Sequence, residues 1–238
     1  MKNIFKYLYY LYYRPKIFLP KKTYSTFGED LIVENFFKNL KKGFYIDIGC
    51  YHPLEGNNTY LLYKKGWGGI NADVNSLSID LFRRARKADY NVNIAVSNQK
   101  KKLKIYFRKK INMLNTSSKK LAKIHFRNGF ESKFINSNTL DSVIKASKFK
   151  KKRIDFLNID VEGSELNVLK SLNFVKYRPK LICIEIHNHE EMYNKNLDYL
   201  KRNEVYKFLI KKGYKIYWNN GFSFIFNKST QHKSVLNQ

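Results

Sequence analysis

A single α/β domain with a doubly wound, mostly parallel sheet is the fold class that the sequence predicts, from three observations. Apolar stretches of strand length alternate along the chain with amphipathic stretches of helix length. Residues 181–186 are nearly continuous in apolar side chains, as expected for a strand covered on both faces. Residues 214–218 and 222–226 flank Asn219-Asn220-Gly221, a hairpin signal that predicts an antiparallel strand at the C-terminal edge of the sheet.

The 238 residues suffice for one large α/β domain and are few for two. Apolar residues make up 43% of the chain, which is enough for a core. Because repeats and Pro/Gly-rich linkers are absent from the sequence, we predict one domain over residues 23–228. A basic, aromatic segment at 1–22 precedes it, and a frayed tail at 229–238 follows it.

Local periodicity and its breakers place the individual elements. Strands are expected at 44–48, 69–72, 92–96, 154–160 and 181–186, and helices at 28–40, 57–65, 76–87, 140–146, 164–172 and 204–211. Ser25 or Thr26 would cap the first helix, and Gly66 would end the second. Residues 103–107 alternate apolar with basic side chains and predict an antiparallel addition. The polar, weakly periodic segment 109–138 is expected to be a mobile insertion or lid.

The formal net charge of +27 implies attraction to polyanions or to anionic lipid surfaces. Lys, Asn, Ile, Tyr and Phe are all abundant, which is the usage that an AT-rich genome favours for reasons unrelated to binding. We find no element that reads nucleic acid, so a nucleic-acid partner is not expected. Cys50 and Cys183 lack metal-ligand spacing and predict buried, reduced thiols in a cytoplasmic protein. The oligomeric state is left open.

Residues 1–22 differ from the rest of the chain. They contain six basic residues, no acidic residue and many Tyr and Phe, and they lack the small-residue cleavage site of a signal peptide. The sequence has no apolar stretch long enough to span a membrane. Two interpretations stay open: an interfacial anchor on the inner face of the membrane, or a short helix packed on the domain's own surface.

Three carboxylates, Asp47, Asp73 and Asp160, lie at or near the ends of predicted strands. In a parallel sheet these ends share one edge, where ligands bind. Asp73 is placed to accept hydrogen bonds from ribose hydroxyls, and Gly49 would let a ligand approach the backbone. Cys50-Tyr51-His52-Pro53 stands where a dinucleotide site would have its glycine-rich helix start. A nucleoside cofactor such as S-adenosylmethionine is therefore favoured over a dinucleotide.

Six short motifs occur in order along residues 23–190. They are Ser25-x-x-Gly28-Glu29-Asp30, Asp47-Ile48-Gly49, Asn58-Thr59-Tyr60, Gly66-Trp67-x-Gly69, Asp160-x-Glu162-Gly163-x-Glu165 and Glu185-Ile186-His187. With them the chain resembles the FkbM-type methyltransferase family. The resemblance implies a class I, Rossmann-like, S-adenosylmethionine-dependent methyltransferase, many of whose relatives act on hydroxyls of sugars or natural products. One departure is Ala72-Asp73-Val74-Asn75, which replaces a Glu-Pro-Asn-type segment.

Carried onto this chain, the resemblance places the cofactor between the ends of the first, second and fourth strands. The expected cofactor-binding residues are Ser25, Asp47, Ile48, Gly49, Asn58, Thr59, Asp73, Val74, Ala95 and Asp160. No metal ligand is predicted, although an oxygen-bound Mg²⁺ near Asp160 is an open alternative.

Methyl transfer requires an aligned acceptor and a base that removes its proton. We expect His187 to be this base because its ordinary pKa is near 6.5. Asp160 and Glu162 are the other predicted catalytic residues, and Glu185 is a further candidate. The alternatives are that His187 bonds a turn, that Asp160 and Glu162 bind cofactor or orient the base, and that Glu162 belongs to a helix start.

The predicted function is O-methylation of a sugar or glycoconjugate hydroxyl, on a small-molecule or glycan acceptor. The charge suggests an alternative, an RNA methyltransferase or RNA-binding protein. Methylation of base amino groups usually goes with an Asn/Asp-Pro-Pro-aromatic loop, and Asp160-Val161-Glu162-Gly163 stands in that position. An NAD-linked oxidoreductase and an inactive binding module are the remaining classes. The acceptor itself is not predicted. Residues 90–130 and the region after His187 are expected to determine which acceptor the protein selects.

Overall fold

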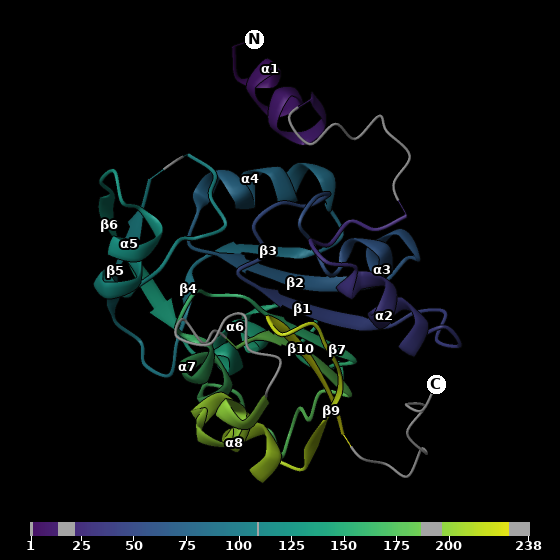
Figure 1. The fold of residues 1–238 in the computed structure, drawn as a ribbon. Coiled ribbons are helices and arrows are strands. Elements are labelled where there is room, and N and C mark those ends of the chain that lie inside the picture. Colours follow the sequence, from purple (N-terminus) through teal and green to yellow (C-terminus); the bar gives the residue numbers. More distant parts are fainter. Residues whose placement is uncertain (1, 14–21, 109, 187–196, 229–238) are drawn as a thin grey trace.

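A seven-stranded sheet forms the centre of the computed structural model, which describes residues 2–13, 22–108, 110–186 and 197–228 (Figure 1). The strand order is β3-β2-β1-β7-β8-β10-β9. The strands are β1 Phe44–Ile48, β2 Gly68–Asp73, β3 Tyr90–Asn93, β7 Phe156–Ile159, β8 Leu181–Glu185, β9 Tyr214–Asn219 and β10 Ser223–Lys228. The chain adds strands on one side of β1 and then on the other, so the order reverses between β1 and β7.

Strand direction confirms the predicted fold class. β1 is parallel to β2 and β7, β2 is parallel to β3, and β7 is parallel to β8. β10 is antiparallel to both β8 and β9, so the closing hairpin lies at one edge as predicted. Within that hairpin the antiparallel strand β10 lies one position inside the sheet, and β9 takes the edge itself.

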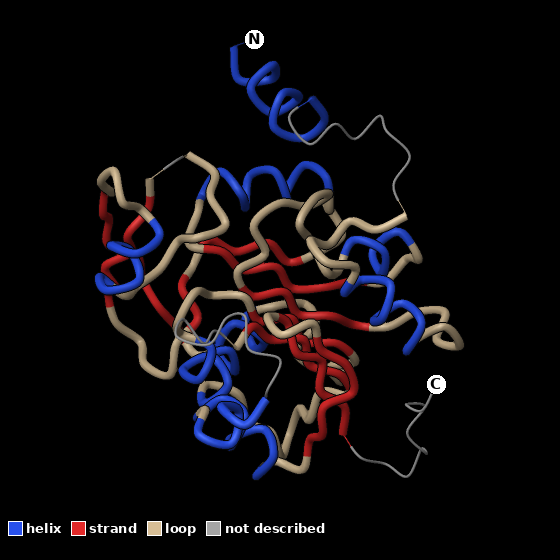
Figure 2. The backbone as a smooth tube through the Cα atoms, in the orientation of Figure 1, coloured by secondary structure: helices blue, strands red, loops and turns tan. Residues whose placement is uncertain are grey.

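Helices cover both faces of the sheet (Figure 2). They are α2 Glu29–Phe36, α3 Tyr60–Lys64, α4 Ser76–Ala85, α6 Leu140–Ala146, α7 Glu165–Lys170, the 3₁₀ turn η2 Leu197–Arg202 and α8 Glu204–Lys211. Successive side chains of a strand point to opposite faces. Ile46 therefore packs with the apolar side chains of α6, α7 and α8, while its neighbour Tyr45 packs with Val33 of α2 and Leu62 of α3. Two apolar layers thus enclose the sheet.

The segment 109–138, which was predicted to be mobile, contains regular structure in its described residues. β4 Ala95–Val96, β5 Lys102–Phe107 and β6 Glu131–Asn138 form a second sheet in the order β4-β6-β5, and helix α5 spans Lys119–His125. We call residues 95–138 the arm. β6 pairs antiparallel with β5 from Asn136 to Glu131. Local periodicity did not reveal this regular structure, because β6 has few apolar residues and its regularity comes from pairing with β5.

Candidate active site

A cavity of about 320 Å³ lies at the carboxyl ends of β1, β2 and β7, where the strand order reverses, and the arm forms its other wall. This volume falls in the range of small-molecule and cofactor sites. Six of the ten predicted cofactor-binding residues line it: Ile48, Gly49, Asp73, Val74, Ala95 and Asp160. Strand ends far apart in sequence are therefore brought together at one cavity, as the strand-end argument predicts.

Asp73 presents an oriented carboxylate to the cavity. One oxygen accepts a hydrogen bond from the backbone N–H of Tyr51 at 2.9 Å, and the other accepts from the N–H of Asn75 at 2.7 Å. A carboxylate oxygen has two lone pairs, so each oxygen keeps one for a ligand. Burial raises the pKa of Asp73 to about 6, against the lowering effect of the two backbone N–H groups. The arrangement fits the two hydroxyls of a ribose.

The pKa of Asp73 leads to a pH dependence of cofactor affinity. An ionised carboxylate accepts hydrogen bonds at both oxygens, whereas protonation turns one of its acceptor positions into a donor. We therefore expect S-adenosylmethionine to bind more tightly as the pH rises through about 6 and to reach a constant affinity above it. Calorimetric titration between pH 5 and pH 8 measures this dependence. In Asp73→Asn the affinity should be lower at pH 8, and the step near pH 6 should disappear; a step that persists in this variant contradicts the assignment.

Gly49 joins the cavity to the end of β7. Its φ of +78° lies in the left-handed region, and a Cβ built on it would lie 1.7 Å from the carbonyl oxygen of Asp160. The predicted reason for this glycine was close approach of a ligand. In the structure the backbone of Asp160 makes that close approach, so Gly49 holds the turns after β1 and β7 in contact.

Asp47 does not line the cavity; it is fully buried within β1, one residue before the end of the strand. Its carboxylate accepts hydrogen bonds from Asn158 Nδ2 at 2.9 Å, Asn57 Nδ2 at 3.1 Å and Thr59 Oγ1 at 2.8 Å. Three of its four lone pairs are thus occupied by protein donors. The sequence interpretation of Asp47 as a direct cofactor ligand is replaced by a supporting role.

A buried arginine, Arg86, supplies the positive charge in this layer, with 0% of its surface exposed. It donates to the carbonyl of Pro53, to Asn57 Oδ1 at 2.7 Å and to Thr59 Oγ1 at 2.7 Å. Its charge lowers the pKa of Asp47, which burial would otherwise raise further. Local periodicity could not have revealed Arg86, because its partners come from a distant loop.

The other three predicted cofactor residues, Ser25, Asn58 and Thr59, also lie outside the cavity lining. Asn58 donates to Asn158 Oδ1 at 2.9 Å and so ties the loop before α3 to β7. Gly28 takes the N-cap position of α2 with φ 85°. Ser25 Oγ donates to the Asp30 carboxylate at 2.8 Å and accepts from the backbone N–H of Asp30, in the first turn of α2, at 3.3 Å. Ser25 lines a second hollow of about 380 Å³, which shares Tyr51 and Met113 with the cavity.

A group of carboxylates stands beside the cavity. Asp160, Glu162 and Glu185 each place a carboxylate oxygen within 4.8 Å of the others, and Asp160 also lines the cavity. Burial raises the pKa of Asp160 well above its ordinary value, and the charges of Glu185 and Glu162 raise it further. The same like charges and the burial favour the protonated form of the Asp160 carboxyl.

These three carboxylates are also the oxygen donors that Mg²⁺ prefers. Acidic groups of this kind are common without an ion, and the sequence prediction named no metal ligand.

Histidines occupy positions that the sequence did not predict. His125 of α5 places Nε2 3.3 Å from the carboxylate of Glu162, whose carbonyl also accepts from Thr116 Oγ1 at 2.7 Å. His125 had no predicted partner, because α5 reaches Glu162 only through the fold of the arm. His52 is buried, and its Nε2 lies 2.7 Å from the carbonyl of Tyr10. His187, the predicted base, lies outside the described residues.

Asn115 of the arm is a further residue that sequence reasoning missed. It lines the cavity, and its Nδ2 donates to the carbonyl of Asn112 at 2.9 Å. Its Oδ1 is buried and has no hydrogen-bond partner among the described residues. A buried acceptor without a partner costs free energy, so a ligand N–H or O–H at this position would stabilise the site. Asn115 and Asp73 together fit a nucleoside.

Fold and site together define a doubly wound α/β protein with a cavity at its topological switch point and a group of three carboxylates beside it. The family model for the methyltransferase FkbM domain matches residues 47–216, more than half of the chain. The chain therefore belongs to the FkbM methyltransferase family.

Two other comparisons accompany this result. Among solved structures, the chain is similar to the METTL16 MTase domain (crystal form 2), with 14% sequence identity and a TM-score of 0.43. The similar region covers 85% of this chain and 66% of that one. No curated protein matches the sequence significantly.

Proposed function

We propose that the protein methylates a hydroxyl oxygen of a carbohydrate or glycoconjugate. The observation that carries this proposal is the position of Asp160. Asp160 lines the cavity, and burial raises the pKa of its carboxyl, which the neighbouring charges of Glu185 and Glu162 raise further. A carboxylate with a raised pKa is a stronger base, which suits removal of a proton from an alcohol.

In this proposal some residues bind the cofactor and others transfer a proton. Bound S-adenosylmethionine supplies a methyl group attached to a positively charged sulfur. Asp73 accepts the ribose hydroxyls, and Asn115 accepts an N–H or O–H of the bound ligand. Asp160 takes the proton of the acceptor hydroxyl as the new C–O bond forms. His125 positions Glu162, whose charge keeps the pKa of Asp160 raised.

The chemistry of the carboxylate group also favours a polyol acceptor over a phosphate-rich one. Several carboxylate oxygens in one place accept hydrogen bonds from neighbouring hydroxyls, as a sugar ring presents them. The same charges repel phosphate groups close to the reaction centre. The three carboxylates lie at the strand ends, whereas the arm supplies the basic residues: eleven Lys and Arg occur between Asp89 and Glu131, without an acidic residue.

RNA is the second candidate acceptor, and the basic arm is the observation that favours it. The arm forms one wall of the cavity, so a bound polyanion would lie beside the cofactor. Binding through lysines alone weakens steeply as the salt concentration rises. Methylation of RNA should therefore fall steeply as the salt concentration rises, whereas methylation of a carbohydrate should not.

The acceptor class is tested with isotopically labelled S-adenosylmethionine and two acceptor pools, cell-surface and lipid-linked glycans in one and total RNA in the other. We expect label in the glycan pool at physiological salt, as an ether that resists mild base, and about background label in RNA. Asp160→Asn serves as the inactive control for both pools. Label that enters RNA at the same salt, and that Asp160→Asn abolishes, would replace the carbohydrate proposal with the second candidate.

A further inference from the structure

Residues 2–13 form a helical segment that packs on the domain through one side. α1 Lys2–Leu8 continues into the π-helical turn η1 Tyr9–Tyr13, above α4 in Figure 1. Leu11 is 5% exposed and packs with Leu77 and Leu81 of α4, and Tyr7 and Tyr10 join the same cluster. The guanidinium of Arg84 lies 3.6 Å from the ring centre of Tyr7. The interpretation as a helix packed on the domain's own surface is therefore correct for one side of the segment.

The other side of this segment is also apolar, and it faces solvent. Its exposed members are Ile4 at 46%, Phe5 at 70%, Leu8 at 45%, Tyr9 at 48%, Tyr12 at 40% and Tyr13 at 71%. These six are among the thirteen exposed large hydrophobic side chains in the described part of the chain. A helix that only packed on its own domain would turn polar residues outward. A continuous apolar face of this kind marks an interaction site.

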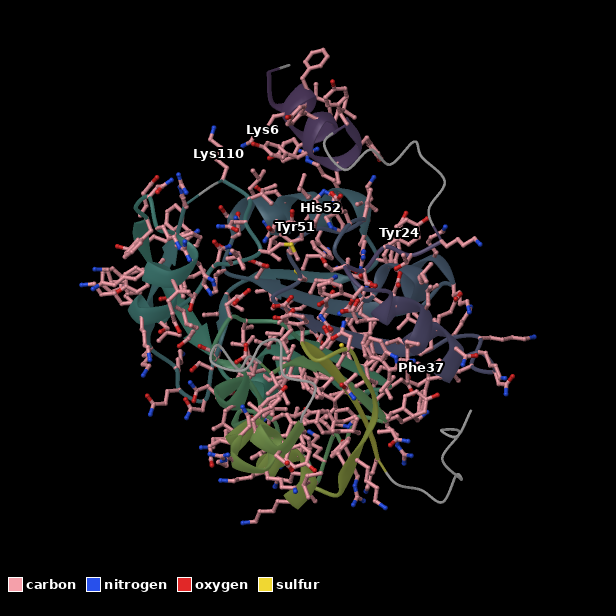
Figure 3. The ribbon with its side chains drawn as sticks, in the orientation of Figure 1. Lys6, Tyr24, Phe37, Tyr51, His52 and Lys110 are labelled. Atoms are coloured by element: carbon pink, nitrogen blue, oxygen red, sulfur yellow. The ribbon has the colours of Figure 1, made fainter. Side chains whose placement is uncertain are left out.

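The sequence around the exposed face is basic. Residues 1–28 contain six Lys and Arg and no acidic residue. Lys6 of α1, Lys110 of the arm and Lys133 of β6 together line a hollow of about 200 Å³, and Figure 3 shows Lys6 and Lys110 on the same side of the molecule. This hollow shares Val74 and Ile105 with the cofactor cavity.

We propose that the exposed side of α1–η1, together with Lys6, Lys110 and Lys133, docks on an anionic lipid bilayer. Tyr and Phe rings settle at the level of the lipid headgroups, and lysines extend from an apolar face to lipid phosphates. Juxtamembrane Lys and Arg each contribute about 1 kcal/mol of attraction to an anionic surface. Docking would be peripheral, since no helix in the described part of the chain has the length and apolar character to cross a bilayer.

A second copy of the chain and a nucleic acid are the two other partners that this face could bind, and each fits it less well. A second copy would bring another formal charge of +27 against the same basic surface, which opposes association. A nucleic acid would match the lysines, but it would leave Ile4, Phe5 and Leu8 without an apolar partner. An anionic bilayer complements both the charge and the apolar face.

Docking also has a consequence for the site. The buried ring of His52 lies 2.7 Å from the carbonyl of Tyr10, and the neighbouring N–H of Tyr51 holds the Asp73 carboxylate (Figure 3). The segment that faces the bilayer is thus bonded to the turn beside the cofactor cavity. If the acceptor is a glycoconjugate, docking brings lipid-linked acceptors close to the reaction centre; this consequence rests on the proposed function, while docking itself does not.

Vesicle co-sedimentation of the full chain without cofactor tests the docking surface. We expect binding to vesicles with about 30% phosphatidylglycerol in phosphatidylcholine at about 0.1 M salt, where charges roughly 10 Å apart still interact, and weak binding to phosphatidylcholine alone. Phe5→Ser/Tyr13→Ser removes apolar contact, and Lys6→Glu/Lys110→Glu reverses charge. Each pair should weaken binding to the anionic vesicles at least tenfold without changing the melting temperature by more than about 2 °C, because these residues lie at the surface.

Matched controls lie on the far side of the molecule, where α8 is found at the opposite end of Figure 1 from α1. Val175→Ser/Ile210→Ser replaces two exposed apolar residues, and Lys211→Glu/Lys212→Glu makes the same change in net charge. Both controls should bind within twofold of the parent chain. The proposal is overturned if the controls lose as much binding as the test variants, or if the test variants bind normally. It is equally overturned if Phe5→Ser/Tyr13→Ser instead abolishes a dimer seen by sedimentation.

Discussion

Replacing Asp160 by asparagine is expected to lower the rate of methyl transfer by about 10²- to 10⁴-fold, the usual contribution of a positioned base. Asparagine keeps the size and the acceptor oxygen of the side chain but cannot take a proton at neutral pH. Asp160 is the member of the carboxylate group that lines the cavity, and its pKa is raised by burial, Glu185 and Glu162. The measurement is single-turnover transfer of labelled methyl from saturating S-adenosylmethionine.

Cofactor affinity distinguishes a base from a cofactor ligand in this experiment. If Asp160 acts on the acceptor, Asp160→Asn should bind S-adenosylhomocysteine within about threefold of the parent, a difference below 1 kcal/mol. A parallel loss of affinity and rate would assign Asp160 to cofactor binding instead, the alternative left open by the sequence. Asp80→Asn, an exposed carboxylate of α4 that bonds Arg83, should change neither quantity.

Replacing Gly49 by alanine is expected to abolish cofactor binding and to lower the free energy of unfolding by about 3 kcal/mol or more. A left-handed residue with a Cβ costs about 1–2 kcal/mol. Crowding in a packed interior typically costs a further 1–3 kcal/mol. The added Cβ would lie 1.7 Å from the carbonyl oxygen of Asp160, so the turns after β1 and β7 must separate. Urea unfolding and calorimetric titration with cofactor measure the two effects.

Gly66 provides a matched control for this change. It also lies in the left-handed region, with φ +83°, but a Cβ there would have no heavy atom within 4 Å. Gly66→Ala should therefore show only the backbone cost of about 1–2 kcal/mol and unchanged cofactor affinity. Equal stability losses in the two variants would show that the contact between Gly49 and Asp160 adds nothing to the backbone cost.

The parts of the fold that follow local rules were predictable from the sequence. β1 at residues 44–48, α6 at 140–146 and α8 at 204–211 occur at the predicted positions. The hairpin around Asn219-Asn220-Gly221 also forms as predicted. Apolar periodicity and turn residues act over a few positions, so they can be seen in one sequence. β6 was missed because its strand structure comes from pairing with β5.

The candidate site also contains residues that local rules predict and residues that they do not. The strand-end rule identified Asp73, Gly49 and Asp160, because parallel strands bring their carboxyl ends to one edge of the sheet. It could not separate them from Asp47, which ends a strand in the same way but bonds three protein donors. A strand end specifies the neighbourhood of a side chain, and the packed loops specify its partners.

The sequence by itself determined the doubly wound sheet, the family and most of the cavity edge, because each depends on local patterns and on residues that follow strands. Only the tertiary structure decided that Arg86 supports Asn57 and Thr59, that His125 meets Glu162, and that residues 2–13 leave a second apolar side exposed. The physical reason is that these contacts join segments far apart in the chain. Their energies depend on burial and distance, which exist only after the sheet has formed.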